Sequence, residues 1–152
     1  MTIIAPPGNV IAVETAMGFN QILESLRVEL PRQNFHILTE VDFSRELDSQ
    51  IGLSTSRYIV LIVWHAFSAY QALLSDPNGG LMVPFNLVVH QHGCVTTVSV
   101  LFQPLLAQEA SLGIRVLGQD LNRRMRDVML HVGAHEPQSS ECGPSHAAAS
   151  RR

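Results

Sequence analysis

The pattern of apolar and polar positions is clearest between Arg57 and His90, where it predicts a strand, a helix and a second strand. Residues 59–63 form a continuous aliphatic run, as expected of a strand that is covered on both faces. Residues 66–74 place apolar side chains at helical spacing, and a turn rich in Pro and Gly separates them from the apolar run 81–90. We therefore expect this stretch to hold most of the core.

The segments on both sides extend this pattern. An amphipathic helix is predicted over 17–30, and Pro31 should end it because proline disfavours the helical conformation of the residue before it. The run 94–102 should pair with 81–90 as a hairpin, through a three-residue loop that ends in Gly93. The remaining predicted elements are an interrupted edge strand over 3–13, a strand over 35–43, short helices over 44–51 and 105–117, and a final amphipathic helix over 119–132.

Length and composition bound the class of protein. A chain of 152 residues with 46% apolar and 15% charged residues suggests one globular domain, which we place over residues 1–133. From residue 134 the composition turns to Ser, Ala, Gly, Pro and His, which predicts a disordered tail through residue 152.

Charge and hydropathy exclude several partners. Ten basic and 13 acidic residues give a net charge of −3, so no broad positive field favours nucleic acid. All basic residues are Arg. The absence of Lys excludes a Schiff base, a pyridoxal-phosphate anchor and a P-loop lysine, and we expect no cofactor. We expect no membrane partner either, because no apolar run approaches the roughly 18 residues that a membrane helix needs.

The amino terminus and the cysteines bear on location. The start, MTIIAPPGNV, has no basic residue and no long apolar run, so it is not typical of a signal peptide. Cys94 and Cys142 lie far apart in the sequence and indicate neither a disulfide framework nor an oxidising compartment. These observations predict a soluble, cytoplasmic protein.

The most specific pattern is a strand, an A-x-x-A-L helix, an Asp-Pro turn, a Gly-Leu pair and a Pro-x-Asn strand. It includes LTEVDF, then Tyr58 at the start of an aliphatic strand, then SAYQALLSDPNGGLMVPFNLVV. In this order of elements the chain resembles the bacterial family called domain of unknown function 302, from about the first helix to the last. The resemblance implies a two-layer α+β fold: a curved, mainly antiparallel sheet of about five strands with helices packed on one face. It also implies a homodimer, and it implies no agreed activity.

The chain departs from that family at a strand–helix corner. Family members often carry a cysteine near the end of the central strand and another after the Pro of the next strand, where this chain has Trp64 and Phe85. The Asn-Pro that often opens the helix is His65-Ala66 here, whereas Asn86 is retained. An indole cannot replace a thiolate, so any thiol or metal role in relatives is lost or replaced.

The Trp64–His65 pair is the first candidate site. A strand end that faces a helix start commonly lines a cleft, and a helix N-terminus favours an anion. His65 could then bind a ligand or transfer a proton. The alternative is that His65 only begins the helix, with Trp64 filling the core. Ser68 and Gln71 have capping-box spacing, which would start the helix about two residues later.

Two other groups of residues could carry chemistry. His90 and His92 share a strand face and could bind a metal, but no third ligand is evident at a fixed spacing, so a solvated hairpin tip is the alternative. Glu40 and Asp42 alternate on the same predicted strand face as His36 and could act as acid and base. Their alternative is an exposed strand face, or a carboxylate that holds an arginine such as Arg57.

These candidates support three hypotheses. The first is a non-enzymatic homodimeric module that binds a small apolar or anionic ligand, or a protein partner. Its pocket would have apolar walls and a few polar groups. The residues expected to line it are Trp64, His65, Phe67, Tyr70, Phe85, Asn86 and Glu40.

The second hypothesis is a small hydrolase or isomerase that uses His65 as its base. It requires the imidazole within hydrogen-bond reach of Glu40 or Asp42. The third is a metal or haem protein that binds through histidines.

Overall fold

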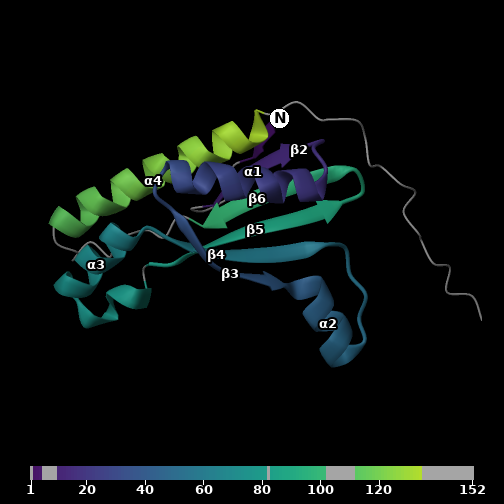
Figure 1. Cartoon of the computed structure of the whole chain (residues 1–152), viewed down its shortest axis with the longest axis horizontal. Coiled ribbons are helices and arrows are strands. Elements are labelled where there is room, and N and C mark those ends of the chain that lie inside the picture. The colour runs from purple at the N-terminus through teal and green to yellow at the C-terminus, as the bar shows by residue number, and fades with distance from the viewer. Residues whose placement is uncertain (1, 5–9, 82, 102–111, 135–152) are drawn as a thin grey trace, which may run out of the picture.

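A computed structural model describes residues 2–4, 10–81, 83–101 and 112–134 of the chain (Figure 1). The strands are β1 (Thr2–Ile4), β2 (Val10–Thr15), β3 (His36–Asp42), β4 (Tyr58–Trp64), β5 (Phe85–His92) and β6 (Val95–Leu101). The helices are α1 (Phe19–Arg32), α2 (Phe43–Ile51), α3 (Ala66–Ser75) and α4 (Leu112–Gly133), with a short 3-10 helix, η1 (Pro77–Leu81). Residues 135–152, most of the predicted tail, lie outside the described residues.

The strands form one antiparallel sheet in the order β1-β2-β6-β5-β4-β3. The predicted α+β class is therefore confirmed, with six strands in the described part of the chain rather than about five. The difference arises at the amino terminus, where the predicted interrupted strand is two strands. Thr2–Ile4 and Val10–Thr15 pair with each other in an antiparallel register instead of continuing in one direction.

Two helices cover one face of this sheet. In Figure 1, α1 and α4 lie side by side over the strands, whereas α2 lies beyond the far end of β3 and β4. Alternate residues of the central strands point toward the two helices and are buried, as the period of two requires. The core consists mainly of Val13, Phe19, Ile22, Leu23, Leu26, Leu30, Leu61, Val63, Phe85, Leu87, Val89, Val98, Val100, Leu121, Met125, Val128 and Met129.

The end of α1 corrects the prediction that Pro31 stops the helix. The helix includes Pro31 and ends at Arg32. Asn34 then adopts a left-handed conformation with φ 61°, and the N–H groups of Asn34 and Phe35 bond to the carbonyls of Pro31 and Leu30. This is a Schellman motif, which satisfies carbonyls that a helix end would otherwise leave unpaired.

The hairpin of β5 and β6 also differs from its prediction. β5 begins at Phe85, because residues 77–81 form a 3-10 turn, and it continues to His92, which pairs with Val95. The loop therefore has two residues, and Gly93 takes its first position with φ 59°, as in a type II′ turn. Cys94, the second loop residue, is disulfide-bonded, contrary to the expectation from cysteine spacing.

The last helix begins earlier than predicted. α4 runs without a break from Leu112 through Gly113, which was expected to interrupt a separate short helix, and ends at Gly133. The first part of that predicted short helix, up to residue 111, lies outside the described residues. Within the described parts of the chain, no helix has the length and hydropathy needed to cross a membrane.

Close packing of η1 against α3 makes Gly79 a sensitive position. A Cβ atom at Gly79 would lie 2.5 Å from the carbonyl oxygen of Ala72, whereas at Gly80 the nearest atom would be a Leu73 methyl at 3.9 Å. We expect Gly79→Ala to lower the free energy of unfolding by about 1–3 kcal/mol, because helix backbone cannot move aside cheaply. Gly80→Ala is the matched control and should change it by less than about 0.5 kcal/mol in urea denaturation. Equal effects of the two substitutions would contradict the tight contact.

Candidate functional site

The junction between β4 and α3 positions His65. β4 ends at Trp64, and His65 is the N-cap of α3, with an extended backbone conformation. Its Nδ1 accepts a hydrogen bond from the backbone N–H of Ser68 at 3.3 Å and lies 2.8 Å from the Ser68 hydroxyl. The helix therefore starts at Ala66, and the later start suggested by the Ser68–Gln71 spacing is wrong.

The contacts of His65 define which of its nitrogens can bind a ligand. The side chain is 9% exposed, and the ring packs edge-on against Phe35 at a centroid distance of 5.7 Å. Because Nδ1 accepts the Ser68 N–H, the neutral imidazole carries its proton on Nε2. Among the described residues, Nε2 has no hydrogen-bond partner. It is therefore a donor available to a ligand.

Burial lowers the pKa of His65, and nearby charges modify this effect. After burial, the next contribution comes from the Arg124 guanidinium, which also lowers the pKa; Asp120 raises it, and His36 lowers it slightly further. Arg124 and Asp120 lie on α4, His36 lies on β3, and Arg124 Nε donates to Asp120 Oδ2 at 2.7 Å. The imidazole is consequently neutral in the folded protein at neutral pH.

An open cavity of about 340 Å³ adjoins this histidine. Its lining consists of Asn34, His36, His65, Ala66, Phe67 and Arg124. The Schellman motif at the end of α1 holds Asn34 at this cavity. His36 lies beside His65 because the antiparallel register pairs it with Trp64, one residue before His65. Arg124 comes from α4. The cavity thus collects hydrogen-bond donors from three separate segments at the N-terminus of α3, where the helix dipole is positive.

The remaining residues predicted for this corner lie elsewhere. Phe85 is 1% exposed and packs edge-on against Phe35 in the core, and Trp64 is half-buried against the same core. Neither Trp64 nor Phe85 lines this cavity. Asn86 is exposed on β5, and Tyr70 is exposed on α3. Of the predicted set, the structure brings only His65 and Phe67 together.

Glu40 is turned away from His65 by a β-bulge. The pairing of β3 with β4 shifts between Ile37 and Thr39, so alternation reverses after that point. Glu40 pairs across the strands with Leu61 and therefore faces α1, not the opposite face that strict alternation predicted.

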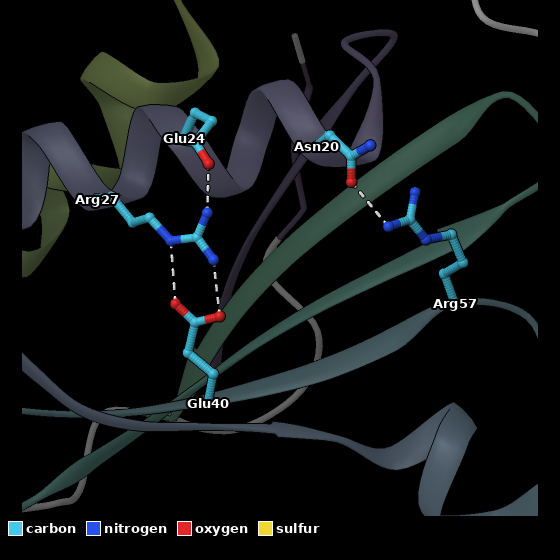
Figure 2. A network of polar contacts seen from close by, with 5 residues as sticks. All are labelled: Asn20, Glu24, Arg27, Glu40 and Arg57. Carbon is cyan, nitrogen blue, oxygen red and sulfur yellow. Dashed lines mark hydrogen bonds and ion pairs between the residues drawn. The ribbon is translucent and has the colours of Figure 1, made fainter.

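Arg27 of α1 holds this carboxylate. Figure 2 shows the guanidinium on both carboxylate oxygens of Glu40, at 3.0 and 2.8 Å, with Glu24 as a further partner. Arg57, the partner suggested by the sequence, instead donates to Asn20 at 2.7 Å and lies over the Phe19 ring.

The carboxylates required by the hydrolase hypothesis are engaged elsewhere. Asp42 accepts a hydrogen bond from the Arg45 N–H at 3.1 Å as the N-cap of α2, and Glu40 is paired with Arg27. Among the described residues, neither bonds to His65. The structure therefore gives that hypothesis no support.

His90 and His92 do not form a metal site in the described part of the chain. His90 stacks on Tyr58 across β4 and β5, at a centroid distance of 5.8 Å and an angle of 15°. No group of three or more His, Cys, Asp or Glu that could hold a metal ion is present among the described residues.

Sequence reasoning did not identify Asn34 and Arg124 as site residues. Asn34 follows the helix by two positions, and Asn is the residue besides Gly that most often adopts the left-handed conformation there, so this position could have been inferred. Arg124 had no local indication, because a triplet of arginines on an amphipathic helix is typical of a solvated face.

These features define an α+β protein with an open antiparallel sheet, helices on one face and a polar cavity where the central strand meets a helix. The family model described as "Domain of unknown function DUF302" matches residues 11–132, so the chain belongs to this family. The resemblance noted in the sequence is thereby confirmed. Comparison with curated proteins found no match.

A solved structure shows the same fold. It is the crystal structure of an uncharacterized conserved DUF302 protein from Bacillus stearothermophilus, which is 18% identical to this chain. The match covers 82% of this chain and 98% of the other, with a TM-score of 0.74. At this identity the likeness shows the fold alone.

The lowered pKa of His65 predicts an acid-sensitive stability. Below the ordinary histidine pKa of about 6.5, the unfolded chain binds a proton that the folded imidazole resists, so stability falls as the pH is lowered through this window. His65→Asn retains a capping side chain but does not titrate. We expect the free energy of unfolding to fall less in this variant than in the wild type between about pH 7.5 and 5.5. His65→Ala should cost about 1 kcal/mol relative to the wild type at pH 7.5, because the cap is lost, and less at pH 5.5, where the wild type has lost stability through His65. Identical pH profiles for the wild type and His65→Asn would contradict this account.

Proposed function

We propose that this protein is a non-enzymatic α+β module that binds a small anionic ligand in the cavity at the start of α3. The observation that carries the proposal is the buried His65, whose Nε2–H is directed to no protein acceptor among the described residues and which lines that cavity. The family is described as one of unknown function, so the argument depends on the chemistry of these residues.

The charge at the cavity favours an anion. Arg124 is 31% exposed, and its Nε donates to Asp120, which leaves the two terminal nitrogens without a hydrogen-bond partner among the described residues. Charge-assisted bonds from a guanidinium to a carboxylate or phosphate are stronger than neutral ones. The positive end of the α3 dipole adds to this preference.

Anion binding should also depend on pH. A bound anion beside His65 would favour the protonated imidazole and oppose the effect of burial and of Arg124. The affinity for the anion should therefore rise as the pH falls toward the ordinary pKa of histidine, and binding should be accompanied by uptake of a proton. Asp120 and His36 are the other titratable groups near this ring, and their contributions are opposite in sign.

Arg124 and Arg123 provide a matched pair for a test. Both bond to Asp120, but only Arg124 lines the cavity, and Arg123 is 71% exposed. With inorganic phosphate as the titrant, we expect Arg124→Gln to weaken binding about tenfold or more, as loss of a charge-assisted bond implies. Arg123→Gln should change it less than about twofold. Chemical-shift titration of labelled protein reports both affinity and location. Equal losses in the two variants, or no shifts at residues 34, 65 and 66, would refute the proposal.

The homodimer is a further part of this proposal. α3 leaves Phe67, Tyr70 and Leu74 more than half exposed on one side, and an apolar surface of this kind commonly marks an interaction site. We expect sedimentation velocity to show a dimer at micromolar concentration, and Leu74→Glu to shift it to a monomer. If the wild type is a monomer at every concentration tested, the dimer is excluded, and the apolar surface of α3 would then be a binding site for another protein.

The cytoplasmic location stays a prediction.

A further inference from the structure

A second cavity lies at the opposite end of β4. Its volume is about 370 Å³, and its lining consists of Phe43, Leu47, Thr55, Ser56, Arg57, Tyr58, His90, Gln91 and His92. Tyr58 opens β4 whereas His65 follows its end, so the two cavities are separated by the length of the strand, roughly 20 Å. No residue lines both.

Three stacked rings form one wall of this second cavity. Phe43 stacks on Tyr58 at 5.7 Å and 24°, and Tyr58 stacks on His90 at 5.8 Å and 15°. The register of the sheet creates the second pair, because Tyr58 and His90 are cross-strand partners on β4 and β5. Tyr58 lies between Phe43 and His90, so this wall presents the edges of its rings, against which a further planar ring can pack edge-to-face.

The fold leaves this wall open. None of the residues of α2 is buried, and Phe43 and Leu47 are 44% and 37% exposed although both line the cavity. Figure 1 shows α2 beyond the end of the strands, away from the layer formed by α1 and α4. These apolar side chains therefore face the cavity without contributing to the core.

The side chains at this cavity favour an anionic ligand over a cationic one. The lining includes Arg57, His90 and His92 and contains no carboxylate. Arg57 already bonds to Asn20 and lies over Phe19, so its charge acts at a distance. The two imidazoles form no hydrogen bond among the described residues and can donate an N–H to an oxygen.

We propose that this cavity binds a small planar aromatic carboxylate. The ligand ring packs edge-to-face against Phe43 and Tyr58, and the carboxylate lies toward His90 and His92. A volume near the lower end of the range for ligand pockets suits one or two fused rings. This site is independent of the anion site at His65, because it requires none of the same residues.

The test compares three compounds in chemical-shift titrations of labelled full-length protein. The compound 2-naphthoate has both the ring and the charge, cyclohexanecarboxylate has the charge alone, and 2-naphthylmethanol has the ring alone. We expect 2-naphthoate to shift the amides of residues 58 and 90–92 and to bind about tenfold more tightly than either control. Equal binding of the three compounds, or absence of shifts at these residues, would overturn the proposal.

Three variants locate the interaction. Tyr58→Leu should weaken 2-naphthoate binding about tenfold, whereas Leu130→Ala, which shortens an exposed apolar side chain on α4, should leave it unchanged. His92→Asn changes an exposed side chain on the hairpin and should weaken binding several-fold without loss of fold. An unchanged affinity in both Tyr58→Leu and His92→Asn would refute the site.

The compounds also separate this proposal from the anion site. If 2-naphthoate shifts only the amides of residues 34, 65 and 66, and Arg124→Gln abolishes these shifts, the result would support anion binding at the start of α3 and refute binding in the second cavity. Shifts at residues 58 and 90–92 that survive Arg124→Gln would support the second cavity whatever the result with phosphate.

Discussion

Burial of one sheet face beneath α1 and α4 is the interaction on which the rest of the structure depends. Each fully buried Leu or Ile of this layer contributes about 1.5–3 kcal/mol, and Leu26, Leu30, Leu61 and Leu87 are all inaccessible or nearly so. The Arg27–Glu40 pair between α1 and β3 is partly exposed, and such pairs contribute about 0–1 kcal/mol. Apolar packing therefore fixes the position of the helices, and the ion pair only adjusts it.

The cavity at His65 is a consequence of that packing. The end of α1 turns through Asn34 so that Phe35 can enter the core, and the same turn places Asn34 at the rim of the cavity. Packing of Leu121 and Met125 on the sheet brings Arg124, on the adjacent side of α4, to the start of α3. Donors that are distant in sequence thus meet because their neighbours are buried together.

The two ends of β4 differ in character for a related reason. At its end, α3 begins immediately, and the helix N-terminus and His65 produce a polar cavity. At its start, α2 packs only loosely, and the stacked rings of Phe43, Tyr58 and His90 produce an aromatic one. The two cavities at the ends of this strand therefore differ in the side chains that line them.

The sequence by itself determined most of the elements, because apolar periodicity reflects which side chains must be buried. The α+β class and the family followed from the resemblance of its motifs to those of a known family. The sequence also indicated His65 as a residue of interest, since a strand end followed by a helix start is a local feature. Only the tertiary structure decided the partners of each side chain. A bulge after Ile37 turned Glu40 toward α1, Phe85 entered the core, and Arg124 reached His65 from a helix some 60 residues away in the chain. These outcomes depend on register and on helix packing, which are set by contacts between distant segments and leave no local pattern in the sequence.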